Sequence, residues 1–116
     1  MKKPDALATL SALAQENRLD VFRLLVEAGP DGMAAGEIAA RLLIAPNALT
    51  FHLDRLREAG LVTVQRAGRS MIYAARFDAM NALVAYLTEN CCGGALEKCA
   101  PVTACKPSAT RKKQPV

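Results

Sequence analysis

Four cysteines near the end of the chain are the residues whose type and spacing are best suited to chemistry. They fall within fifteen residues, at Cys91, Cys92, Cys99 and Cys105. Thiolates select soft metal ions. Gly93 and Gly94 give the backbone freedom to fold Cys99 back onto the adjacent pair. Three thiolates arranged in this way predict a pyramidal site for As(III) or Sb(III), with Cys105 as a candidate substitute for Cys99.

Other uses of these thiols stay open at this stage. The spacing contains no Cys-x-x-Cys and no nearby histidine, so a zinc finger or ribbon is not expected. The thiols could instead form a redox switch, bind another soft metal or have no function.

The segment from Cys105 to Arg111 fits the Cys-x5-Arg loop of small phosphatases. That loop requires a strand before it and a helix after it, and this Pro- and Lys-rich segment predicts neither. We therefore expect no enzyme active site.

The charge distribution favours a polyanionic partner. The 116 residues carry a net charge of +4, and four cations without an anion lie between Lys106 and Lys113. A second basic stretch covers residues 44–77, where five arginines stand against two acidic residues. A basic stripe on a neutral body is typical of nucleic-acid binding, although a solvated surface would also explain it. No apolar run approaches the roughly 18 residues of a membrane span, and from Lys2, Lys3, Pro4 and Asp5 we expect no secretory signal. We expect a cytoplasmic protein without membrane contact.

The hydrophobic periodicity predicts five helices and one hairpin. The first helix starts at Pro4-Asp5, with apolar positions at Leu7, Leu10, Leu13 and Ala14. The second is capped by Asn17 and ends at Gly29, and the third covers about Ala35 to Leu43. After a turn, Asn47 caps a fourth helix that runs to Glu58. Strands at Leu61–Arg66 and Ser70–Arg76 form the hairpin, and Asp78 caps the fifth helix over Ala79–Glu89.

This order predicts a mainly α (α+β) fold, a winged helix-turn-helix with a β-hairpin wing after the recognition helix. Residues 1–90 would form the DNA-binding and dimerisation domain. Residues 91–116 would form a basic, cysteine-containing, largely disordered tail.

The predicted fourth helix has one apolar side and one polar side. Leu49, Leu53 and Leu56 form the stripe expected to be buried. The other side offers groups that suit base edges and phosphates, and the wing adds two arginines, so the candidate DNA-binding residues are Asn47, Thr50, Phe51, Arg55, Arg66 and Arg69. The simpler alternatives are that Phe51 packs under the wing and that the arginines are ordinary surface charge. A winged helix used only for protein interaction also remains open.

Three segments resemble the ArsR/SmtB family of metal-responsive winged-helix repressors. They are Gly36–Leu42, the turn Ala45-Pro46-Asn47, and Leu49–Val62 with its His-Leu-x-x-Leu-Arg-Glu-Ala-Gly-Leu run. The resemblance covers residues 5–90. It implies a homodimer joined through the first and last helices, which represses by binding a double-stranded operator and releases it on metal binding.

The cysteine pair that follows the last helix resembles the arsenic-responsive branch of that family. The Cys-x-Cys expected in the third helix is replaced by Ala34, Ala35 and Gly36, and the last helix lacks the histidines of the zinc sensors. The resemblance therefore implies sensing through Cys91, Cys92 and Cys99. The sequence predicts a repressor of ars-type resistance genes that takes As(III) or Sb(III) as inducer and needs no organic cofactor. The alternative is a thiol-redox or other soft-metal sensor on the same fold.

Overall fold

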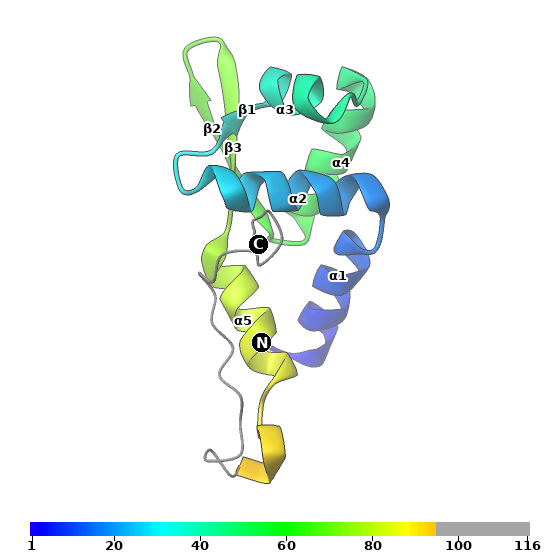
Figure 1. The fold of residues 1–116 in the computed structure, drawn as a ribbon, viewed down its shortest axis with the longest axis vertical. Helices are drawn as coiled ribbons and strands as arrows, with labels where there is room; N and C mark the ends of the chain where they lie inside the picture. The colour runs from blue at the N-terminus through cyan, green and yellow to red at the C-terminus, as the bar shows by residue number, and fades with distance from the viewer. Residues whose placement is uncertain (95–116) are drawn as a thin grey trace, which may run out of the picture.

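Helices form most of the structure, and a small sheet packs against them (Figure 1). The computed structural model describes residues 1–94. Its elements are α1 (Lys3–Leu13), α2 (Glu16–Ala28), β1 (Met33–Ala34), α3 (Ala35–Leu42), α4 (Pro46–Glu58), β2 (Val62–Ala67), β3 (Ser70–Ala75), α5 (Phe77–Leu87) and a 3-10 turn, η1 (Cys91–Gly94). The predicted winged helix-turn-helix is confirmed, with α3 and α4 as the helix-turn-helix and β2–β3 as the wing. No helix in this part of the chain is long and apolar enough to cross a membrane.

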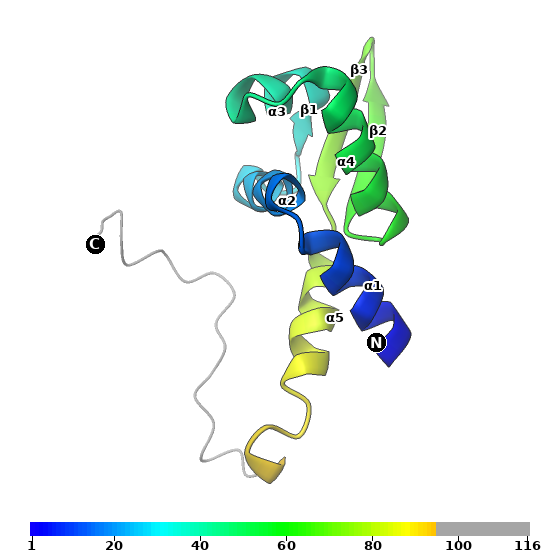
Figure 2. The ribbon, with the colours of Figure 1, turned by 90° about the vertical axis from the view of Figure 1, so that its right-hand side faces the viewer.

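The core lies where α2, α3 and α4 meet the sheet. The predicted stripe on α4 is confirmed, because Leu49, Leu53 and Leu56 are at most 2% exposed. Val21, Phe22 and Leu25 of α2, Ile38 of α3 and Val62 of β2 complete the same cluster. Figure 2 shows α4 beside the wing; α2 and α3 contact both α4 and β3, so these elements surround the core. Burial on one side of α4 leaves its opposite side to solvent.

The sheet contains a third strand that the sequence did not predict. Two residues, Met33 and Ala34, pair antiparallel with Tyr73 and Ile72, so the strand order is β1-β3-β2. Two residues are too few to show an alternating pattern, which explains why this strand was missed. The preceding Gly32 makes the pairing sterically feasible. Its φ is 73°, and a Cβ there would collide with the Tyr73 carbonyl oxygen.

The starts of α2 and α4 differ from the prediction. The side chain of Gln15, not that of Asn17, caps α2, and it accepts a hydrogen bond from the Arg18 amide at 2.9 Å. The fourth helix begins two residues early, with Ala45 rather than Asn47 at the capping position, because Pro46 occupies its first position, where proline is favoured. Asn47 therefore lies inside the first turn of α4.

The start of α5 forms the junction between the wing and the last helix. Arg76, rather than Asp78, is the capping position. Its amide donates to the Leu61 carbonyl at 2.8 Å, and its guanidinium contacts the Asp78 carboxylate at 2.8 Å. That hydrogen bond is the main reason the pKa of Asp78 lies below its usual value. Asp78 is therefore an acidic residue of the first turn of α5, paired with Arg76, and not the capping residue.

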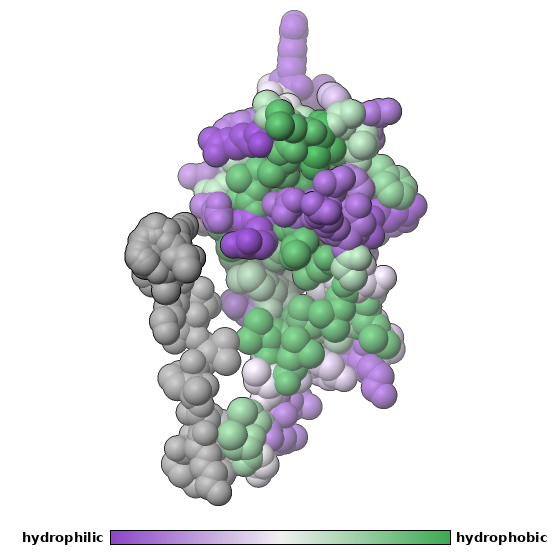
Figure 3. Space-filling view, turned by 45° about the vertical axis from the view of Figure 1, so that its right-hand side comes forward, coloured by the Kyte–Doolittle hydropathy of each residue, from purple (hydrophilic) through white to green (hydrophobic). Residues whose placement is uncertain are grey.

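Helices α1 and α5 lie together below the core and leave an apolar surface uncovered. Ala6 and Thr9 are the buried residues of α1, whereas the predicted apolar positions Leu7 and Leu10 are 59% and 40% exposed. Leu87 of α5 is 59% exposed. Figure 3 shows hydrophobic surface over these two helices, below a hydrophilic band. Of the predicted apolar positions of α1, Leu13 packs against the core, whereas Leu7 and Leu10 are not covered within a single chain.

Two glycines provide a matched test of the sheet. We expect Gly32→Ala to lower the free energy of unfolding by about 2 kcal/mol or more, because φ is positive and the added methyl meets backbone. Gly36→Ala should raise it by about 0.5 kcal/mol, since this helical glycine has nothing within 4 Å of an added Cβ. Urea unfolding followed by circular dichroism measures both. Equal stability of the two variants would contradict the role assigned to Gly32.

Candidate DNA-binding face and thiol pair

The exposed side of α4 carries the side chains predicted to contact DNA. Asn47, Thr50, Phe51 and Arg55 are all exposed. The Asn47 Oδ1 atom accepts a hydrogen bond from the Ala48 amide at 2.9 Å. The Thr50 hydroxyl donates to the Pro46 carbonyl at 3.0 Å. These bonds use one acceptor of Asn47 and the donor of Thr50. The Asn47 amide nitrogen can still donate, and the Thr50 oxygen can still accept.

Arg55 is held between two neighbours on this side of α4. Its guanidinium carbon lies 4.8 Å from the centroid of the Phe51 ring, and its Nη1 lies 2.8 Å from Glu58 Oε1. Phe51 is 51% exposed, so it does not pack under the wing. This contribution of Glu58 was not predicted, although its i, i+3 spacing from Arg55 indicates such a pair. Exposed ion pairs of this kind contribute about 0–1 kcal/mol, so Arg55 can exchange Glu58 for a nucleic-acid partner.

The wing carries the other two predicted arginines. Ala67 pairs with Ser70, which leaves Gly68 and Arg69 as the two residues of the hairpin turn. Gly68 has a φ of 62°, the conformation that such a tight turn requires. Arg66 Nε donates to the Gly68 carbonyl at 3.3 Å. The hairpin tip reaches beyond the helices (Figure 2), so Arg66 and Arg69 lie on its projecting end.

His52 lies on the buried side of α4 and not on its exposed side. It is 9% exposed, and its Nδ1 has no hydrogen-bond partner among the described residues. Burial, and secondarily the positive charge of Arg18, hold the pKa of His52 below its usual value. His52 is therefore neutral at neutral pH and acts as a core side chain of the recognition helix.

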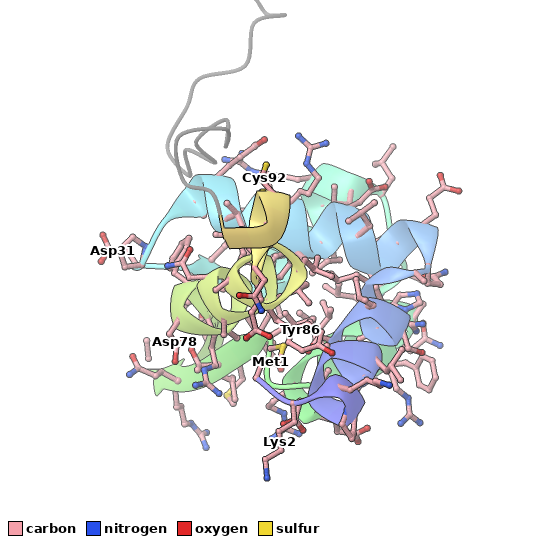
Figure 4. The ribbon with its side chains drawn as sticks, turned by 90° about the horizontal axis from the view of Figure 1, so that it is seen from below. Met1, Lys2, Asp31, Asp78, Tyr86 and Cys92 are labelled. Carbon is pink, nitrogen blue, oxygen red and sulfur yellow. The ribbon has the colours of Figure 1, made fainter. Side chains whose placement is uncertain are left out.

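The first two cysteines form a close pair on the turn after α5. Cys91 and Cys92 are exposed, and their sulfur atoms lie 3.6 Å apart. The Cys91 amide donates to the Thr88 carbonyl, which ties η1 to the end of α5. Figure 4 shows Cys92 on this terminal turn. Cys99, Cys105 and the Cys-x5-Arg segment lie outside the described residues. Within residues 1–94, no three His, Cys, Asp or Glu side chains gather into a metal site.

Comparisons with known proteins identify the class of molecule. A family model described as a helix-turn-helix domain matches residues 13–65. The chain is 32% identical over 87 residues to the HTH-type transcriptional regulator YgaV of Escherichia coli (strain K12), a match covering 75% of this chain and 86% of that protein. It is 29% identical over 82 residues to the transcriptional activator HlyU of Vibrio cholerae, covering 71% and 73%.

A solved structure agrees with these relatives. The ArsR-like transcriptional regulator from Rhodococcus sp. RHA1 matches with a TM-score of 0.67 at 26% identity, covering 81% of this chain and 84% of that one. The fold and the exposed side of α4 thus define a winged helix-turn-helix transcriptional regulator, a DNA-binding protein rather than an enzyme. The chain belongs to the ArsR/SmtB family of these regulators.

The buried histidine predicts how stability depends on pH. Because the folded state lowers the pKa of His52, the unfolded chain binds this proton at higher pH than the folded chain does. Stability due to His52 is therefore present above the unfolded pKa of about 6.5 and is lost as pH falls toward the folded value. We expect the melting temperature to fall between pH 7 and pH 5.5 in the wild type and to change less in His52→Gln. His52 is the only histidine of the chain, so identical pH profiles would contradict its assignment.

Proposed function

We propose that this chain is a homodimeric repressor that releases its operator when As(III) or Sb(III) binds a three-thiolate site. The observation that carries the proposal is the pair of exposed thiols, 3.6 Å apart, on the turn that ends α5. A soft-metal site there would lie just beyond the end of one of the two helices that carry the uncovered apolar surface.

The side-chain chemistry of α4 and the wing supports the DNA contacts. An Asn amide suits adenine, an Arg guanidinium suits guanine, and an apolar ring suits the thymine methyl group. Asn47, Phe51 and Arg55 supply these three groups on one helix side, and Thr50 adds a hydroxyl. Arg66 and Arg69 on the wing would contact the sugar-phosphate backbone.

The uncovered apolar surface on α1 and α5 supports a homodimer. Leu7, Leu10 and Leu87 are 40–59% exposed and lie on the two helices that the family resemblance places in the dimer interface. A second copy would remove these side chains from water. The two-fold dimer would then place two recognition helices on half-sites about 34 Å apart, one helical turn of DNA.

The geometry of the thiol pair supports a shared soft ion. Two thiolates bound at about 2.3 Å with a tetrahedral angle between them have sulfur atoms about 3.8 Å apart, and the narrower angles of a pyramidal three-thiolate ion bring the sulfurs somewhat closer. The 3.6 Å separation of the Cys91 and Cys92 sulfurs is close to that value. Cys99, or Cys105 in its place, would supply the third thiolate. Binding of one ion by all three thiolates would reorient η1. The hydrogen bond from the Cys91 amide to the Thr88 carbonyl would transmit the change to α5.

The same pair favours one alternative function, a thiol-redox regulator. A peroxide would oxidise one thiol to a sulfenic acid, releasing water. The second thiol would then displace a second water molecule and form a disulfide between the two sulfurs. Peroxide-driven release of DNA without metal would favour this alternative.

The proposed sensing is tested by fluorescence anisotropy. Reduced protein is bound to a labelled duplex from upstream of its own gene, and arsenite is added. We expect wild-type protein to dissociate, whereas Cys91→Ser, Cys92→Ser and Cys99→Ser should bind the duplex equally well and stay bound. Cys105→Ser is the matched control and should respond. If Cys99→Ser dissociates on addition of arsenite and Cys105→Ser does not, Cys105 is the third ligand. Wild-type protein that stays on the duplex would contradict As(III) sensing.

The proposed dimer has a separate test. We expect Leu10→Glu to shift the protein from dimer to monomer in sedimentation velocity, because it introduces a charge into the apolar surface of α1 and α5. Leu19→Glu is the matched control, since Leu19 is 43% exposed on α2, outside that surface. A dimer that persists in Leu10→Glu, or a monomeric wild type, would overturn the interface.

A further inference from the structure

An open hollow of about 320 Å³ lies where α1 and α2 meet the recognition helix. Two arginines, one carboxylate and one hydroxyl provide its polar groups, and the remaining lining is alanine; the residues are Ala8, Ser11, Ala12, Arg18, Arg55, Glu58 and Ala59. Arg55 and Glu58 also belong to the exposed side of α4. The hollow is therefore continuous with the proposed DNA-binding face.

Arg18 is fixed in place at the hollow. Its Nε donates to the Ala12 carbonyl at 2.7 Å, and its amide donates to the Gln15 side chain. The residue lies in the first turn of α2, where the helix dipole is positive. Its charge also acts on the recognition helix, because it contributes to lowering the pKa of His52.

The charges of the hollow favour an anion. Arg18 and Arg55 contribute two positive charges, and Glu58 is the one carboxylate among the lining residues. Glu58 is already bonded to Arg55 at 2.8 Å. The alanine side chains are small, so a backbone phosphate and its sugar can approach the guanidinium closely.

We infer that this hollow binds a phosphate of the DNA backbone, with Arg18 as its anchor. The inference rests on the proposed DNA-binding face, which it extends beyond α4 and the wing onto α2. A phosphodiester is favoured over a free anion because the hollow is open and shares Arg55 with that face. The site holds the register of the recognition helix on the duplex and is independent of base sequence.

The test measures DNA affinity by anisotropy across a salt series. It uses the duplex from upstream of the gene and a random-sequence duplex of the same length. The variants are Arg18→Gln, Arg18→Lys and Ser11→Asp, which adds a negative charge at the hollow without altering Arg18. Arg23→Gln is the matched control because it removes one charge from an exposed position of the same helix.

Arg18→Gln should weaken binding about fivefold for each protomer near 0.15 M salt, equally on both duplexes. The slope of log Kd against log salt should fall by about 1 for each protomer. Arg18→Lys should retain most of the affinity, Ser11→Asp should lose it, and Arg23→Gln should behave as wild type. Replacing single phosphates by uncharged methylphosphonates should reveal a position that weakens wild type and not Arg18→Gln.

Several results would overturn the site. One is an unchanged salt slope in Arg18→Gln, and another is a loss confined to the upstream duplex. A third is a loss of DNA affinity in Arg18→Gln that is explained by a lower melting temperature of that variant, while Ser11→Asp binds DNA normally. That result would make the role of Arg18 purely structural. Inorganic phosphate that raises the melting temperature of wild type and not of Arg18→Gln, without any methylphosphonate effect, would assign the hollow to a free anion. In each of these cases the wild-type protein still binds DNA, so the proposed DNA-binding function stands. If the wild-type protein binds neither duplex, both the phosphate site and the DNA-binding function are overturned.

Discussion

Burial of Leu49, Leu53 and Leu56 fixes the orientation of α4, and the chemistry of the exposed side depends on that orientation. Each buried leucine contributes about 1.5–3 kcal/mol, whereas the ion pairs on the opposite side contribute about 0–1 kcal/mol each. The helix therefore cannot rotate to improve a surface contact, but its surface arginines can change partners. A recognition helix needs this combination of a rigid backbone and exchangeable side-chain contacts.

Helix α1 packs against α2 and α4, whereas α5 meets the core through Phe77 and Met80 near its start. The junction around Arg76 adds the backbone bond to Leu61 and the ion pair with Asp78. Because these contacts with the core all lie near the start of α5, a change at its far end can alter the direction of the helix without disrupting the core. Moving a regulator from 99% bound to 1% bound requires about 5.5 kcal/mol of differential binding. Three bonds to a soft ion would have to supply most of it.

The elements with strong periodicity were predictable, and the features set by tertiary contacts were not. The leucine stripe of α4 and the hairpin around Gly68 are encoded in local patterns that agree with the fold. Strand β1 forms only because Tyr73 and Ile72 are available to pair with it, and nothing in the sequence near Met33 indicates that pairing. Leu7 and Leu10 have the spacing of core residues, but a periodic pattern does not specify which surface will cover them. Arg18 stands 37 positions before Arg55 in the sequence, so only the packing of α2 against α4 brings them to one hollow.

All four thiols of the chain follow α5 in the sequence, and the core cluster of the described residues contains no cysteine. Irreversible oxidation of these cysteines to sulfonic acid would therefore disable the proposed metal site without unfolding the part that contacts DNA. Under the proposed function, a damaged molecule would still occupy its operator and would no longer respond to inducer. The damaged repressor would keep the regulated genes off even beside undamaged copies, since each damaged copy blocks the operator until it is degraded or diluted by growth. Protein turnover would then set how quickly the regulated genes recover after oxidative stress.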